Sequence, residues 1–222
     1  MPHFTHHSEE NYLKALYKLS SKDVRKVNNI ALAKLMSLNP ATVLEMVRKL
    51  SDKKLVQLLP DKSIQLTDKG KKEALLIIRK HRLWEVFLVE KLNYDWNEVH
   101  ALAEQLEHVD SEDLINRLEE FLNYPAFDPH GDPLPDRQGR MQHNVTVPLF
   151  NCSKGKTYVV QNFAETDDHF LDYLSKLSIK PGVKLKIIDV NEFDLSHTVS
   201  IAKQMTYLSE KAARNIMVLP AS

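Results

Sequence analysis

Four side chains that can bind a divalent metal ion fall within the segment HALAEQLEHV. They are His100, Glu104, Glu107 and His108, separated by steps of four, three and one, in a helix expected to begin near Trp96. Residues three and four apart lie on one face of an α-helix, so this spacing predicts a single face of imidazoles and carboxylates. That face normally carries the apolar stripe of a core-facing helix. Its replacement by nitrogen and oxygen donors indicates a metal-binding role.

A second pair of the same kind precedes this segment, in KHRLWEVFL. His81 and Glu85 lie four residues apart, within a long helix expected over 67–90. If the two helices are antiparallel neighbours, their donors suffice for one or two octahedral divalent sites. Two other interpretations stay open: a solvated charged helix face, in which such pairs add modest support, or a dimetal oxidation centre in a carboxylate–histidine bundle.

The elements that position these residues belong to a chain of ordinary globular composition. Its 222 residues predict two or three domains, and 43% hydrophobic with 27% charged residues fits a packed core. No apolar run is long enough for a bilayer, and the N-terminus does not resemble a secretory signal. The lone Cys152 excludes an internal disulfide framework. We therefore expect a cytoplasmic protein with no membrane partner.

The net charge of zero hides an asymmetry along the chain. Residues 1–70 contain 12 Lys and Arg against 7 Asp and Glu, whereas residues 71–140 contain 9 against 15. A basic first third beside an acidic middle indicates an anion-binding module followed by a cation-binding one.

The first third has the pattern of a winged helix-turn-helix. Apolar periodicity predicts an amphipathic helix around residues 12–19 and a second from about Asn28. A third begins at Asn39-Pro40, where Asn caps the helix and Pro takes its first position. The segment LVQLLPDKSIQLTDKG then predicts a hairpin. In this motif the second helix of the pair enters the DNA major groove while the hairpin approaches the backbone.

Two groups of residues in this module are candidates for DNA contact. The start of the third helix would read bases, and nearby cations would contact phosphates. The proposed base-contacting positions are Asn39, Ala41, Thr42 and Glu45, and the proposed phosphate-contacting positions are Arg25, Lys26, Arg48, Lys49 and Lys62, with Lys22, Lys53 and Lys54 nearby.

Residues 123–140, rich in Pro, Gly and Asp, read as an ordered loop or linker. After it, short alternating runs predict strands in VTVPL, KTYVVQNF, KLKIIDV, HTVSIA and NIMVL. A short helix is expected in FLDYLSKLSIKPG. The last third therefore predicts a small β-barrel.

Several segments together resemble the diphtheria toxin repressor/manganese transport regulator family of metal-dependent transcriptional repressors. RKHRLWE at 79–85 followed by VHALAEQLEHV at 99–109, behind a winged helix, is a specific signature of that family. The other segments that carry the resemblance are NYLKALY at 11–17, NPATVLEMVRKL at 39–50, LTDKGKK at 66–72 and DPHGDPLP at 128–135.

The resemblance implies how the ligands divide between two metal positions. His81, Glu85 and His100 match the ancillary position; Glu104, Glu107 and His108 match the primary, regulatory one. Iron-responsive members have Cys at the position of Glu104, and manganese-responsive members have Glu. In manganese-type members His81 can join Glu104, Glu107 and His108 around a close pair of ions, so the division between sites stays open.

The resemblance also implies ligands from outside the two helices. A ligand from the first helix corresponds to Asn11, an uncharged amide, and one turn later manganese-type members can have Glu where this chain has Lys14. A protonated lysine cannot bind a metal. In the C-terminal barrel, Glu165 and His169 are candidates to complete the ancillary position.

The sequence thus predicts a mainly α fold with small β parts in three domains. These are a winged helix-turn-helix (1–70), a helical metal-binding and dimerisation domain with a Pro-rich linker (71–140), and an SH3-like (FeoA-like) domain (141–222). The predicted function is a Mn²⁺- or Fe²⁺-dependent repressor of metal-uptake genes, not an enzyme, with Zn²⁺, Co²⁺ or Cd²⁺ as substitutes in vitro. As a homodimer it would bind a pseudo-palindromic operator in double-stranded DNA. The alternatives are a carboxylate-bridged dimetal enzyme and a winged-helix regulator that senses an organic ligand.

Overall fold

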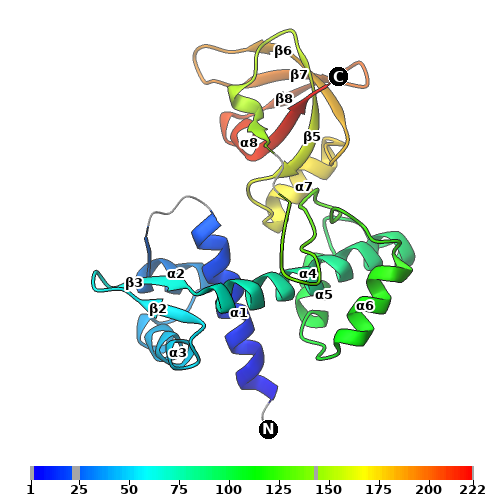
Figure 1. Cartoon of the computed structure of the whole chain (residues 1–222). Helices are drawn as coiled ribbons and strands as arrows, with labels where there is room; N and C mark the ends of the chain where they lie inside the picture. The colour runs from blue at the N-terminus through cyan, green and yellow to red at the C-terminus, as the bar shows by residue number, and fades with distance from the viewer. Residues whose placement is uncertain (1–2, 22–25, 143–144, 222) are drawn as a thin grey trace. The chain divides into compact units, whose positions relative to one another are not determined.

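The computed structural model describes residues 3–21, 26–142 and 145–221 (Figure 1), with side chains described from residue 9 onward. The chain forms two compact units. The first unit comprises Met1–His81, Gln105–Ser111 and Pro135–Met141, and the second comprises Arg82–Glu104, Glu112–Leu134 and Gln142–Ser222.

The first unit begins with three helices, α1 (His3–Ser21), α2 (Asn29–Met36) and α3 (Pro40–Asp52). Asn39 caps α3 by accepting a hydrogen bond from the backbone N–H of Ala41, and Pro40 is the first helical residue. The turn between α2 and α3 requires a left-handed residue, which is Ser37 with φ of 54°. These local signals produce the predicted helix-turn-helix.

A three-stranded antiparallel sheet completes this module. Its strands are β1 (Val27–Asn28), β2 (Val56–Leu58) and β3 (Ser63–Leu66), in the order β1-β3-β2. β2 and β3 form the expected hairpin, closed by a turn in which Lys62 has a φ of 65°. The core beneath it is apolar and includes Tyr12, Leu13, Leu16, Leu32, Val43, Val47, Leu50 and Ile64.

The long helix α4 (Asp68–Leu92) begins against this core, close to the expected 67–90. Gly70 lies in its first turn, where a Cβ would stand 1.9 Å from the carbonyl oxygen of Leu55. Only glycine permits this close approach of helix and backbone. The start of α4 is thereby fixed to the loop before β2.

The second unit contains the C-terminal part of α4, most of α5 (His100–Leu106) and all of α6 (Glu112–Phe121). Its helical core consists of Leu83, Val86, Ile115, Leu118 and Leu122, with Trp84 and Phe87 packed beside it. On the same unit Leu114 and Phe121 remain exposed.

The rest of the second unit is a six-stranded antiparallel sheet in the order β4-β9-β5-β6-β7-β8. The strands are β4 (Val147–Pro148), β5 (Thr157–Phe163), β6 (Lys184–Val190), β7 (His197–Ile201), β8 (Gln204–Leu208) and β9 (Ile216–Pro220). A 3-10 helix η1 (Leu149–Asn151) and the helices α7 (Asp168–Lys176) and α8 (Glu210–Asn215) accompany it. The predicted fold class is confirmed, and the elements that were not predicted are β1, β8, η1, α6 and α8.

One helix is shorter than the residue spacing predicted. α5 begins at His100 rather than near Trp96, and it ends at Leu106. The residues before it form turns, in which Glu98 N–H donates to the Asp95 carbonyl. Glu107 and His108 therefore lie in the turn after α5 and not on its face.

Among the residues that the structure describes, no single helix combines the length and apolar composition needed to span a bilayer. Only α2 and α3 taken together, across a bend of 111°, reach that length and composition.

Candidate metal centre and DNA-binding surface

Glu107 is the centre of a buried polar cluster in the first unit. Its side chain is fully inaccessible to solvent, and its Oε2 lies 2.6 Å from Nδ1 of His81 on α4. Nζ of Lys14, on α1, lies 2.8 Å from Oε1 and 2.7 Å from Oε2. Both carboxylate oxygens are thus engaged by side chains of the chain itself.

His108, next to Glu107, also has a partner on α1. Its Nδ1 lies 2.6 Å from Oε2 of Glu10, whose Oε1 is 3.5 Å from Nζ of Lys80. Asn11 stands beside Glu10 in sequence, and its Oδ1 is buried without a hydrogen-bond partner among the described residues. A buried acceptor without a partner is unusual, and its role as a ligand stays a prediction.

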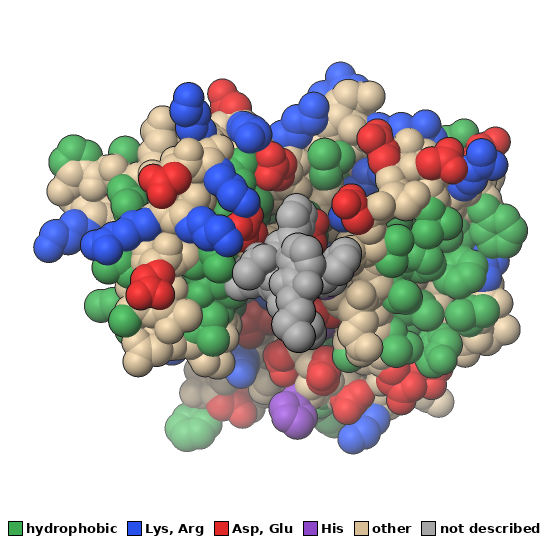
Figure 2. Space-filling model, turned by 90° about the horizontal axis from the view of Figure 1, so that it is seen from below, with side chains coloured by type: hydrophobic (Ala, Val, Ile, Leu, Met, Phe, Trp, Pro, Cys, Tyr) green, Lys and Arg blue, Asp and Glu red, His purple; other side chains and the backbone are tan. Residues whose placement is uncertain are grey.

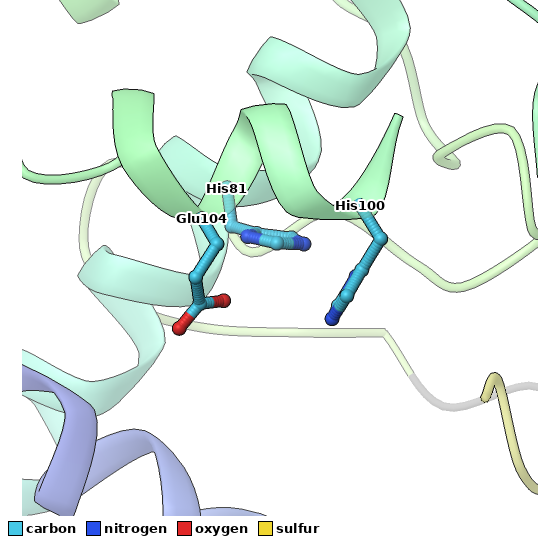
Figure 3. Close-up of side chains that lie close together, drawn as sticks. All are labelled: His81, His100 and Glu104. Atoms are coloured by element: carbon cyan, nitrogen blue, oxygen red, sulfur yellow. The ribbon is translucent and has the colours of Figure 1, made fainter. Parts of the chain in front are cut away.

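His81, His100 and Glu104 form a local group of possible ligands. Each offers one ligand atom, and these atoms lie within 4.8 Å of one another. His81 comes from α4, whereas His100 and Glu104 come from α5 (Figure 3). One carboxylate and two imidazoles are a chemically suitable, thiolate-free donor set for a divalent ion.

A second group, wholly inside the second unit, consists of Glu85, Asp128 and His130. All three are buried, and their ligand atoms also lie within 4.8 Å of one another. Nδ1 of His130 is 3.5 Å from Oε2 of Glu85, and Nδ1 of His100 is 3.3 Å from Oε1 of Glu85. Nε2 of His130 is buried and has no hydrogen-bond partner among the described residues. That nitrogen is available as a ligand.

The loop that carries Asp128 and His130 is held by its own hydrogen bonds. Oδ1 of Asp128 accepts from the backbone N–H groups of His130 and Asp132, at 2.8 and 3.0 Å. Nε of Arg82 lies 3.2 Å from Oδ2 of Asp128, and Nη2 lies 3.2 Å from Oδ2 of Asp132. The loop is therefore ordered, as its composition predicted, and it presents its side chains toward α4.

The group of Glu85, Asp128 and His130 has an excess of negative charge. Burial, together with the charges of Asp132 and Glu85, raises the pKa of Asp128 to about 7, against the opposing charges of Arg82 and His130. Burial alone would lower the pKa of His130, but the hydrogen bond and charge of Glu85 raise it overall. The group thus retains protons that a divalent cation could replace. Its donors and its charge both fit a metal ion.

The expected ligands are only partly brought together. Glu85 and His100 are neighbours, as are His81 and Glu107, while Glu165 and His169 are exposed and belong to neither group of ligand atoms found among the described residues. Asp128 and His130 were not predicted as ligands. The segment DPHGDPLP could have indicated them as ligands, because it concentrates Asp and His in a loop of turn-forming residues.

The DNA-binding candidates lie mostly on one exposed face of α3. Ala41, Thr42, Glu45 and Arg48 are exposed, opposite the buried positions of the helix, and the side chain of Asn39 is engaged in capping. Figure 2 shows Lys and Arg side chains gathered on part of the molecular surface. Arg25 lies outside the described residues, as does Lys22.

Three of the predicted phosphate-contacting lysines have definite surroundings. Lys49 and Lys53 approach the buried Glu9 of α1, at 2.8 and 2.6 Å. Lys26 pairs with Asp61 in the hairpin turn, at 2.5 Å, and Lys62 is exposed in the same turn. Lys49 therefore has an intramolecular partner as well as a predicted role at DNA.

A winged helix-turn-helix combined with buried carboxylate–imidazole groups defines a class, the metal-responsive DNA-binding proteins. Family models agree along the chain: the iron-dependent repressor N-terminal DNA-binding domain matches residues 4–64, the metal binding and dimerisation domain matches 67–136, and the FeoA domain matches 147–220. The chain belongs to the diphtheria toxin repressor family of metal-dependent transcriptional repressors. The predicted family is confirmed.

Individual relatives agree with this assignment. The diphtheria toxin repressor of Corynebacterium diphtheriae is 33% identical over 200 residues, covering 85% of this chain and 88% of that protein. The iron-dependent repressor IdeR of Mycobacterium tuberculosis is 36% identical over 126 residues, covering 57% of this chain. That match spans about half (54%) of the length of the mycobacterial protein.

Solved structures resemble the whole fold. A manganese-dependent transcriptional repressor in complex with manganese superposes with a TM-score of 0.85 at 32% identity, covering 96% of this chain and 100% of the other. The repressor ScaR, at 31% and 30% identity, has been solved with bound Zn²⁺ and with bound Cd²⁺.

Proposed function

We propose that this chain is a divalent-metal-dependent transcriptional repressor that binds a double-stranded operator as a homodimer, with Mn²⁺ or Fe²⁺ as its effector. The observation that carries the proposal is the buried Glu85–Asp128–His130 group in a chain that also has a winged helix. Arg82 contacts Asp128, and a divalent cation would compensate the negative charge that remains on the two buried carboxylates.

The donors favour a hard or borderline ion. Both groups of ligand atoms contain only oxygen and nitrogen, which suits Mn²⁺ and Fe²⁺ better than ions that seek thiolates. His81, His100 and Glu104 would form a second binding position, and Asn11, Glu165 and His169 remain candidates for additional ligands. When bound, the ion would supply positive charge to the buried carboxylates and displace their protons.

DNA recognition would follow the geometry of the winged helix. The exposed residues of α3 would enter the major groove, and a two-fold dimer would present two such helices to a pseudo-palindromic operator. A repressor of this kind acts where the DNA is, in the cytoplasm. The ion changes operator affinity only through a difference in its own affinity for the DNA-binding and non-binding states.

The test begins with a duplex selected from a random pool in the presence of Mn²⁺. We expect the affinity of the full chain for that duplex to fall about 10- to 100-fold when Mn²⁺ is replaced by chelator. Asp128→Asn keeps the oxygen that accepts the two loop N–H groups but loses the charge, so its affinity should respond little to Mn²⁺. Fluorescence anisotropy measures both effects.

A matched control is Asp189→Asn, which removes an exposed carboxylate paired with Lys154 on the sheet. It should respond to Mn²⁺ as the unmodified chain does. Failure to enrich any duplex, or equal Mn²⁺ responses of Asp128→Asn and the control, would contradict the proposal.

A further inference from the structure

The contact between Lys14 and Glu107 has features of a built-in cation site. Lys14 is mostly buried, with a side chain 20% exposed, and Glu107 is not exposed at all. The ammonium lies within 2.8 Å of both carboxylate oxygens, so the interaction is bidentate. Residues 14 and 107 come from α1 and from the turn after α5, so the pair joins two distant parts of the sequence within the first unit.

The neighbouring residue in the turn has a similar connection. His108 contacts Glu10, and Lys80 of α4 also approaches Glu10. The two residues that resemblance assigns to a regulatory ion, Glu107 and His108, thus both contact side chains of α1. The contacts of Glu107 and His108 described above are thus all made with side chains of this chain.

A divalent ion does not fit the arrangement around Glu107. To bind that carboxylate, the ion would have to use the two oxygens that the Lys14 ammonium and Nδ1 of His81 already contact. It would then stand next to a buried positive charge, where repulsion is weakly screened. Moving Lys14 aside instead would give up both of its short contacts with the fully buried carboxylate of Glu107, which is unfavourable.

We propose that Lys14 is the resident cation of Glu107: its ammonium excludes a divalent ion from this carboxylate and joins α1 to the turn after α5 whether or not metal is present. Metal ions then bind only at the other groups, around Asp128 and around Glu104. Lys14 is on this proposal a residue that determines how many ions each protomer takes up. The expected number of bound ions rests on the proposed function, whereas the contact between Lys14 and Glu107 in the absence of metal does not.

The decisive variant is Lys14→Met, which keeps the length of the side chain and removes the charge. We expect one more equivalent of Mn²⁺ per protomer than in the unmodified chain, measured by titration calorimetry and by metal analysis after gel filtration. Without metal, the variant should melt about 10 °C lower, because the buried carboxylate of Glu107 loses the ammonium and keeps only its contact with His81 among the contacts described above. Adding Mn²⁺ should restore most of that loss.

Two companion variants separate the explanations. Glu107→Gln should bind as many Mn²⁺ ions as the unmodified chain, because the proposal gives this carboxylate no ion. Lys14→Met combined with Glu107→Gln should return to the original ion count and recover much of the metal-free melting temperature. Lys18→Met, an exposed lysine one turn further along α1, is the control and should change neither quantity.

Loss of one equivalent of Mn²⁺ in Glu107→Gln would overturn the proposal. So would an unchanged ion count in Lys14→Met, or a metal-free melting temperature equal to that of the unmodified chain. If the unmodified chain takes up no Mn²⁺ at all, the proposed function fails. The metal-free melting temperatures of the two single variants and the double variant still decide whether Lys14 and Glu107 are coupled.

Discussion

Glu9 is a buried carboxylate on α1 that contacts lysines at the end of α3. Burial alone would raise its pKa, but the hydrogen bonds from Lys49 and Lys53 lower the pKa below the usual value. Lys49 on α3 and Lys53 directly after it are about half exposed, so solvent weakens each ion pair. Together they nevertheless fix the orientation of α3 on α1.

We expect this carboxylate to give the fold a pH dependence. Because the folded-state pKa is lowered, its contribution is present above the unfolded-state pKa and is lost as the pH falls through the folded value. Glu9→Gln should reduce the free energy of unfolding by about 1 kcal/mol near neutral pH. Urea unfolding at several pH values should show the difference shrinking in acid, below about pH 4. A difference that stays constant into acid would contradict this role.

At the scale of single residues, sequence reasoning reached the donors that lie on helices. His81, Glu85, His100 and Glu104 stand out because helical spacing is regular. Asp128 and His130 do not, because a loop has no period and their closeness to Glu85 depends on how distant segments pack. The contact between Glu107 and Lys14 was not predicted either, because the sequence analysis considered Lys14 only as a residue that cannot bind a metal.

The exposed face of α3 makes a prediction for Arg48 and Lys49, two adjacent cations. Arg48 is exposed, whereas Lys49 lies 2.8 Å from Glu9. Arg48→Ala should weaken binding to all duplexes and reduce the slope of log affinity against log salt by about 1. Lys49→Ala should change that slope less, because its charge is already partly compensated. Equal slopes for the two variants, measured by anisotropy, would argue that Lys49 leaves Glu9 when DNA binds.

The start of α4 makes a second prediction, at Gly70. A methyl group there would meet the Leu55 carbonyl oxygen at 1.9 Å, so the helix must shift away from the loop before β2. Gly70→Ala should lower the free energy of unfolding by about 2–4 kcal/mol despite the better helix propensity of alanine. Lys71→Ala, at the exposed next position, is the control and should lie close to zero. Chemical denaturation measures both, and a stabilised Gly70→Ala would refute the close approach.

At the scale of elements, periodicity and capping residues predicted α1 to α5 and α7, but they did not predict α6 or α8, and strand edges were predicted less well. The Asn39-Pro40 start of α3 and the extent of α4 follow from local chemistry. The sequence predicted α5 to be longer at both ends than it is. The helical spacing of the donor residues continues beyond the point where the backbone turns, so spacing alone does not show where the helix ends. β8 was missed because it is the outer strand of the sheet and its residues are largely exposed, so no apolar alternation marks it.

For the whole molecule, the exposed apolar residues of the helical part predict where two copies meet. Leu83, Leu88 and Leu118 are buried within the protomer, whereas Leu114 and Phe121 are exposed. The ring of Phe121 lies 6.3 Å from that of Phe87. Large exposed side chains at such positions are typical of interfaces.

Phe121→Glu should therefore weaken self-association by about 100-fold or more, because a charge would be buried against the partner. Sedimentation velocity at several concentrations measures the effect. Phe193→Glu is a suitable control, since Phe193 is 97% exposed on the β-rich part. A control variant that dissociates as readily would place the contact elsewhere.

The three-domain division at residues 70 and 140 stays a prediction. The compact units of the structure cut across it, because α4 contributes to both and the 123–140 loop is divided between them. Sequence composition changes at the ends of elements, whereas compactness depends on which side chains pack together. The two criteria need not agree.

Gly131 ties the acidic loop to the β-rich part with unusual closeness. It has a φ of +84°, and a Cβ there would stand 1.7 Å from the carbonyl oxygen of Gln161, while Asn162 donates to Asp132 at 2.8 Å. The terminal sheet is consequently a scaffold for the loop rather than an independent appendage. Exchanging it for an unrelated module, or trimming it away, would leave the segment of Asp128 and His130 dependent on its own hydrogen bonds and on Arg82.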